Sequence, residues 1–155
     1  EVNLLAGLKS AQAYGRRLAD TNQRGRLMVT ASENSLSLPS AVKRSKMAFY
    51  GATKHALLIA MEWMRIDPKF AAMDLHVLMP GAVYTGLISP VLPNPADAPP
   101  ELGLIMPEQC ADIALRGMDH DLFYIPTHGH FIDDMQPRLR EIEAAMTTLH
   151  VNSKA

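Results

Sequence analysis

The sequence has few of the features that mark secreted, membrane-spanning or nucleic-acid-binding proteins. Its one cysteine, Cys110, excludes an internal disulfide and fits a reducing, cytoplasmic compartment. No uninterrupted apolar run is long enough to cross a bilayer. The 15 basic and 16 acidic residues leave a net charge of −1, whereas proteins that bind nucleic acid or anionic membranes usually carry a basic excess. We therefore expect neither kind of partner.

What remains is the composition of a folded domain. Of the 155 residues, 48% are hydrophobic and 20% are charged, which argues against disorder. A chain of this length suits one domain, so we treat residues 1–155 as a single unit.

The hydrophobic pattern alternates between helices and short buried strands. Helices are predicted over residues 2–20, 47–66, 107–118 and 131–148, and strands over 27–31, 75–79 and 122–125. Helix 47–66 is apolar nearly all round, which predicts burial in a core or in an interface. Pro137 must lie in the first turn of the last helix or kink it. Alternating helices and strands are typical of an α/β fold with a parallel sheet.

The segment 86–105 is too rich in proline to be regular and too long for a simple connector. Its prolines are Pro90, Pro93, Pro95, Pro99 and Pro100. A substrate lid and a mobile surface loop are equally good interpretations of this segment.

A tyrosine and a lysine on helix 47–66 form the clearest chemical motif. Tyr50 and Lys54 lie four residues apart, so they share one face of the helix. A lysine cation stabilises a nearby phenolate, which makes such a pair a plausible proton-transfer site near neutral pH. The spacing is common by chance, however, and on this motif alone a snorkelling lysine beside a half-buried aromatic ring is the better explanation.

Three further segments surround this pair. VNLLAG carries Asn3, the strand GRLMVTAS ends at Ser32, and VLMPGAVYTGL contains Pro80, Gly81, Val83 and Thr85. In this order, and together with the Tyr-x-x-x-Lys motif, the segments resemble the short-chain dehydrogenase/reductase family over nearly the whole chain. The resemblance implies a three-layer, doubly wound Rossmann-type parallel sheet. It also implies NAD or NADP as cofactor, and a small alcohol, ketone or aldehyde as substrate.

The resemblance assigns a role to each matching residue. Tyr50 would be the catalytic acid/base, and Lys54 would assist it and hold the nicotinamide ribose. Ser32 would bind the substrate oxygen, and Asn3 would support a water in the proton relay. The nicotinamide carboxamide would be received by Pro80, Gly81, Val83 and Thr85.

Two features depart from the family pattern. Glu33, Asn34 and Ser35 follow Ser32 where a small residue and a glycine are usual, so Ser35 or Ser37 could take the serine role. We favour Ser32 because it lies at the carboxyl end of a strand, where doubly wound sheets bind ligands.

The second departure is that the glycine-rich turn for the cofactor pyrophosphate is absent. The chain therefore resembles the second half of the domain, with about three strands and flanking helices. We expect the open edge of strand 27–31 to be covered by the first half or by another copy.

The resemblance also implies a homodimer or homotetramer that pairs through helices 2–20 and 47–66. A non-catalytic dimerisation or interaction remnant of the same fold is the alternative function. His128, His130, Asp133 and Asp134 cluster in the sequence, but a loop leading into a helix explains them better than a metal site. We predict no metal.

Overall fold

The computed structural model describes residues 2–43 and 45–151. Its sheet contains β1 (Gly25–Thr30), β2 (Met73–Met79) and β3 (Tyr124–Pro126), all parallel and in the order β1-β2-β3. Thr30 pairs with Leu78 and Val77 pairs with Tyr124 in this register. The central strand β2 is buried along almost its whole length, which explains its continuous apolar sequence.

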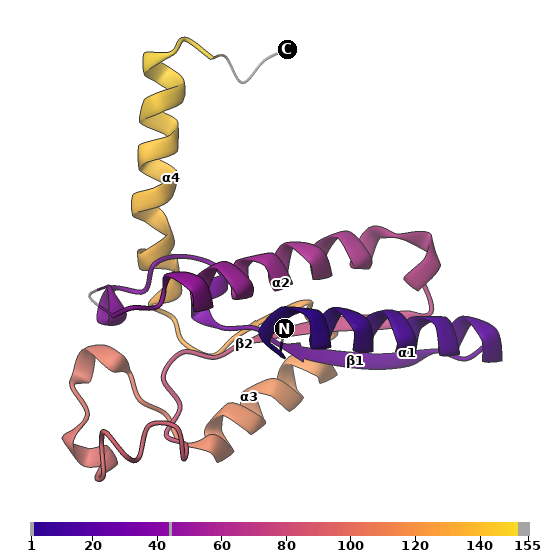
Figure 1. Ribbon diagram of the computed structural model, residues 1–155, viewed down its shortest axis with the longest axis horizontal. Helices are drawn as coiled ribbons and strands as arrows, with labels where there is room; N and C mark the ends of the chain where they lie inside the picture. Colours follow the sequence, from indigo (N-terminus) through magenta and orange to yellow (C-terminus); the bar gives the residue numbers. More distant parts are fainter. Residues whose placement is uncertain (1, 44, 152–155) are drawn as a thin grey trace.

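The helices complete three layers. They are α1 (Gly7–Thr21), α2 (Ala48–Ile66), α3 (Pro107–Asp119) and α4 (Phe131–Thr148). Helices α1 and α2 lie side by side on one face of the sheet, and α3 covers the other face (Figure 1). Ala11 and Met61 are buried on the first side, whereas Ala114 and Ile125 form the smaller core on the second. The expected α/β class and parallel sheet are confirmed.

Helix α2 is only half buried within this chain. Leu57 and Met61 lie in the core, but Ile59 and Trp63 on the opposite face are exposed, Trp63 to 67%. Hydrophobic periodicity cannot separate these two faces, because both are apolar. The core of this chain therefore buries one face of α2 and leaves the other face exposed.

Several local features differ from the sequence-based expectations. The first helix opens with a π-helical turn, Val2–Ala6, before α1 begins. The serine-rich loop contains two 3-10 turns, Glu33–Ser35 and Ser40–Val42. Pro137 lies inside α4, beyond its first turn. A proline there removes one helical hydrogen bond, and the helix continues past it.

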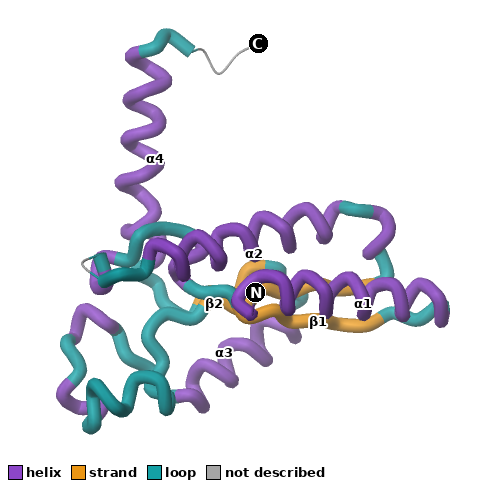
Figure 2. Tube along the Cα trace, in the orientation of Figure 1, coloured by secondary structure: helices purple, strands orange, loops and turns teal. Residues whose placement is uncertain are grey.

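The segment 86–105 is largely loop and extends away from the sheet (Figure 2). Its two ends are joined, because Tyr84 N–H donates to the Ile105 carbonyl (2.9 Å) and Ile105 N–H donates to the Ala82 carbonyl (3.1 Å). Leu87 and Val91 are strongly exposed. The segment is thus a closed loop with an apolar surface.

Helix α4 projects away from the three layers (Figure 1). Of its residues, Phe131 is buried in the main core. None of the helices in the described ranges is both long enough and apolar enough to span a membrane.

Candidate active site

The candidate site lies at the carboxyl ends of β1 and β2. Two backbone hydrogen bonds join the segments that leave these strands. Ala31 N–H donates to the Leu78 carbonyl (2.7 Å), and Glu33 N–H donates to the Pro80 carbonyl (2.9 Å). The turn that contains Ser32 therefore lies directly beside the bend at Pro80.

Lys54 and Tyr50 meet at this end of the sheet. Lys54 is buried, and its Nζ donates to the Thr30 carbonyl over 2.9 Å. The same Nζ lies 5.8 Å from the centroid of the Tyr50 ring. Burial lowers the pKa of Lys54. The half-buried Tyr50 makes no side-chain hydrogen bond with the described residues, so its hydroxyl is available to a bound molecule.

Ser32 is buried and acts as an acceptor within the chain. Its Oγ accepts from the backbone N–H of Asn34 (3.2 Å) and from Asn34 Nδ2 (3.4 Å). Both bonds use the oxygen, so the hydroxyl hydrogen remains free to be donated. A Cβ on Gly51, next to Tyr50, would lie 3.8 Å from Asn34 Oδ1. This contact packs the Ser32 turn against the Tyr50 turn of α2.

The two alternative serines occupy different surroundings. Ser35 is buried, and its hydroxyl has no hydrogen-bond partner in the described part of the chain. Ser37 lines a cavity of about 240 Å³ together with Met47 and His55, and Tyr50 does not line that cavity. Of the three serines, Ser32 lies closest in sequence to the end of β1.

Asn3 and Lys54 share a second cavity. Both line a space of about 350 Å³ that runs along residues 27–30 of β1. Asn3 itself is exposed on the π-helical turn. Among the described strands β1 pairs with β2 alone, so this cavity lies along the open edge of the sheet.

The chain is similar to known dehydrogenases in sequence and structure. No family model matches it. It is 30% identical over 143 residues to the 1-deoxy-11-beta-hydroxypentalenate dehydrogenase of Streptomyces avermitilis, an alignment that covers 90% of this chain and 47% of that protein.

Two solved structures share its fold. The bulky-bulky ketone specific alcohol dehydrogenase from Comamonas testosteroni matches with a TM-score of 0.61 and 20% identity, over 99% of this chain and 53% of that one. A short-chain dehydrogenase from Sphingobium yanoikuyae in complex with NADPH matches with a TM-score of 0.65 and 17% identity, over 99% and 56%. In sequence and in fold the chain thus resembles the short-chain dehydrogenases. It spans about half the length of each of these relatives.

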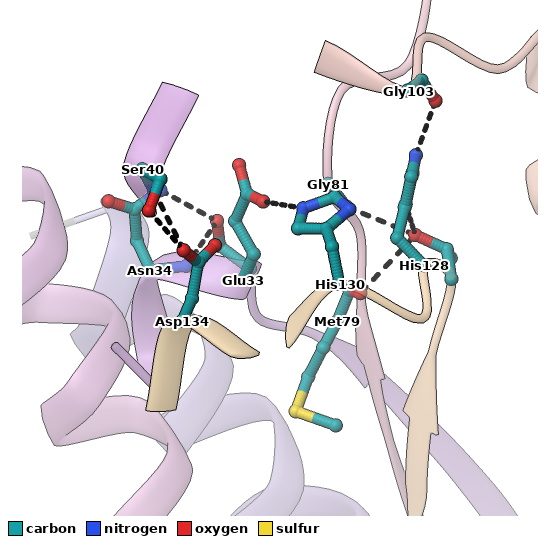
Figure 3. A network of polar contacts seen from close by, with 11 residues as sticks. Glu33, Asn34, Ser40, Met79, Gly81, Gly103, His128, His130 and Asp134 are labelled. Carbon is teal, nitrogen blue, oxygen red and sulfur yellow. Dashed lines mark hydrogen bonds and ion pairs between the residues drawn. The ribbon is translucent and has the colours of Figure 1, made fainter. Parts of the chain in front are cut away.

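A histidine connects the bend after β2 to the loop 86–105. Gly81 N–H donates to Thr127 Oγ1 (3.0 Å), and Thr127 Oγ1 lies 2.6 Å from His128 Nδ1. His128 Nε2 lies 2.7 Å from the Gly103 carbonyl oxygen (Figure 3). Because a carbonyl only accepts, Nε2 carries the proton, and Nδ1 accepts from the Thr127 hydroxyl.

The His128 ring fills a space bounded by two glycines. A Cβ on Gly81 would lie 2.8 Å from His128 Nδ1, and a Cβ on Gly103 would lie 3.2 Å from its Cδ2. Gly103 also has a φ of +57°, which favours glycine. From the sequence His128 is assigned to a loop that leads into a helix, because nothing in the sequence pairs it with either glycine.

The neighbouring polar residues join α4 to the Ser32 segment. His130 Nε2 lies 3.3 Å from Glu33 Oε2, and Asp134 accepts from the Ser40 backbone N–H (3.1 Å) and hydroxyl (2.5 Å) (Figure 3). Burial raises the pKa of Glu33, which the bond to His130 partly opposes. No group of three or more metal-ligating residues is found in residues 2–43 and 45–151.

The last predicted site residues lie on the bend and at the start of the loop. Pro80 and Val83 are half-buried, and Val83 forms a bridge with Ile105. Thr85 is exposed, and its hydroxyl accepts from Leu87 N–H (3.3 Å). The bend at Pro80 thus lies beside the Ser32 turn, whereas Thr85 is exposed to solvent.

Proposed function

We propose that this chain carries the catalytic residues of a nicotinamide-dependent oxidoreductase that interconverts an alcohol and a ketone or aldehyde. The observation that carries the proposal is the position of Lys54, whose buried ammonium is bonded to Thr30 and lies beside the Tyr50 ring. This ammonium places a positive charge beside the proposed proton-transfer group. The similarity to dehydrogenases supports this assignment.

The residues present fit the nicotinamide end of NAD or NADP. The bound cofactor would accept or supply the hydride. Lys54 uses one of its three donors on Thr30, so the other two remain for a ribose hydroxyl. Asn3 lies in the same cavity as Lys54.

The roles of the polar side chains follow from their hydrogen-bonding capacity. Ser32 has a hydrogen to donate to the substrate oxygen, because both of its observed bonds are to its own oxygen. Tyr50 would give its proton to a carbonyl oxygen during reduction and take it from the hydroxyl during oxidation. Lys54 would provide positive charge beside Tyr50 while the proton moves.

We further propose a bulky, apolar alcohol or ketone as the substrate. One solved relative is named for bulky-bulky ketones, and the sequence relative is named for a hydroxypentalenate. The loop 86–105 presents Leu87 and Val91 to solvent, where they would contact such a substrate on closure. On this proposal the loop is a lid.

The test is Tyr50→Phe in the natural full-length protein, assayed with NADPH or NADH and a panel of bulky ketones. We expect kcat to fall by roughly 10²- to 10⁴-fold, because only the proton-transfer group is lost. Cofactor binding, followed by fluorescence, should persist. Tyr124→Phe is the matched control, since its hydroxyl bonds to Glu62 on the surface. Full activity in Tyr50→Phe would refute the assignment.

The alternative is a non-catalytic dimerisation module of the same fold. The exposed apolar face of α2, which includes Ile59 and Trp63, favours pairing of α1 and α2 with a second copy. This function and catalysis are compatible. A module without catalysis would show neither NAD(P)H binding nor any turnover in the unmodified protein.

A further inference from the structure

Helix α4 leaves the body of the molecule after a short region of contact. Asp134 bonds to Ser40, and Arg138 Nη1 donates to the Leu36 carbonyl (3.2 Å) and to His55 Nε2 (3.1 Å). All residues from 139 to 148 are exposed. Most of the helix therefore has no partner in the described part of the chain.

The projecting helix carries a regular apolar stripe. Its members are spaced alternately by three and four residues: Ile132, Met135, Leu139, Ile142, Met146 and Leu149. This spacing is the a/d pattern of a coiled coil. Ile132 is 66% exposed and Ile142 is 50% exposed. Outside the stripe the b and c positions are polar throughout.

We propose that this stripe pairs in parallel with the α4 stripe of a second copy of the chain. In the heptad, Arg138 occupies a g position and Glu143 the following e position. Parallel, in-register pairing places Arg138 of each copy opposite Glu143 of the other, which gives two attractive ion pairs. Antiparallel pairing would place Glu143 opposite Gln136, and both of these ion pairs would be lost.

Arg138 is able to make this contact while it holds α4 to the body. Both of its observed bonds use Nη1, so Nη2 remains for a carboxylate of the second copy. The symmetric stripe and the complementary charges make a second copy the best match to this surface.

The stripe continues beyond the contacts that hold α4 to the body. Those contacts are made by Asp134 with Ser40 and by Arg138 with Leu36 and His55. Leu139, Ile142 and Met146 follow them and are all exposed.

The length of the helix determines how the proposal is tested. Its 18 residues extend over about 27 Å and about two and a half heptads. Isolated coiled coils need about three to four heptads, so the isolated helix is too short to report on pairing. Both experiments therefore use the natural full-length protein.

The first experiment measures register and orientation by crosslinking. Met146→Cys in a Cys110→Ser background should form a disulfide-linked dimer on mild oxidation, because parallel pairing places both copies of residue 146 in one layer. Ala144→Cys, on the outward f position, is the matched control and should crosslink at least tenfold less. Equal crosslinking of the two variants, or none in Met146→Cys, would overturn the proposal.

The second experiment measures assembly by light scattering. Ile142→Lys should raise the dissociation constant of the α4 contact by roughly tenfold or more, because it places two like charges in an apolar layer. Glu141→Lys, on a polar position, should leave the mass unchanged. Glu143→Arg should weaken assembly, and Arg138→Glu in the same chain should restore it. An unchanged mass in Ile142→Lys would show that another part of the same chain covers the stripe, and the proposal would fail.

Discussion

The Nε2–H of His128 donates to the carbonyl oxygen of Gly103 over 2.7 Å, and this bond fastens the end of the loop 86–105 to the bend after β2. The other ring nitrogen reaches the bend through Thr127, which accepts from Gly81 N–H. The loop expected to cover the substrate and the bend expected to receive the nicotinamide therefore share one side chain. Movement of either segment changes the hydrogen bonds of the other.

Removal of this side chain should loosen the loop. In His128→Ala, we expect faster amide hydrogen exchange across residues 86–105 and a loss of about 1–2 kcal/mol in the free energy of unfolding, because two hydrogen bonds are lost. His120→Ala is the matched control, since His120 is exposed. Hydrogen exchange followed by mass spectrometry tests the prediction, and identical exchange in the two variants would contradict it.

A methyl group at Gly81 should displace the same ring. The added Cβ would lie 2.8 Å from His128 Nδ1, so the imidazole must shift and its bonds must lengthen. We expect Gly81→Ala to raise the KM for the cofactor several-fold and to lower stability by roughly 1–3 kcal/mol. Adding His128→Ala should recover part of the lost stability, because the clash disappears. Gly86→Ala, which meets nothing within 4 Å, should be close to neutral.

The sequence predicts the order of the elements well because the signals are local. The apolar runs that became β1 and β2, and the Tyr50–Lys54 spacing, are readable over a few residues. The links through Asn34 and His128 are not, because each depends on segments that meet only in the fold. His128 is 25 residues from Gly103 in sequence. For α2 the sequence leaves burial in a core and burial in an interface open, since apolar side chains have the same pattern in both.

The His128 link should weaken in acid. Burial lowers the pKa of His128 below its ordinary value of 6.5, and the nearby His130 acts in the same direction, while the bond to Gly103 opposes them. The unfolded chain then binds the proton more readily than the folded one. Stability therefore decreases as pH falls from about 6.5 through the folded pKa. The free energy of unfolding in urea should decrease less between pH 7 and pH 5 in His128→Asn than in the unmodified protein. Equal decreases in the two proteins would contradict this.

Ser32, rather than Ser35 or Ser37, should carry the serine function. We expect Ser32→Ala to lower kcat by roughly 10²-fold or more, because a donor to the reacting oxygen is removed. Ser35→Ala should keep its activity and its stability, since the hydroxyl that it removes is buried without a partner. Steady-state kinetics on the three alanine variants test this. A loss in Ser35→Ala or Ser37→Ala that equals the loss in Ser32→Ala would reassign the role.

Lys54→Met separates the charge of the lysine from its volume. Methionine keeps most of the apolar stem that packs in α2, but it removes the ammonium beside the Tyr50 ring and the donor to Thr30. We expect the fold to persist, since the variant also removes the cost of a buried charge. Turnover should fall by roughly 10²-fold or more, because the positive charge beside the proton-transfer group is lost. Lys69→Met, at an exposed position, is the matched control and should leave turnover unchanged. A Lys54→Met protein that keeps the turnover of the unmodified protein would contradict this role of Lys54.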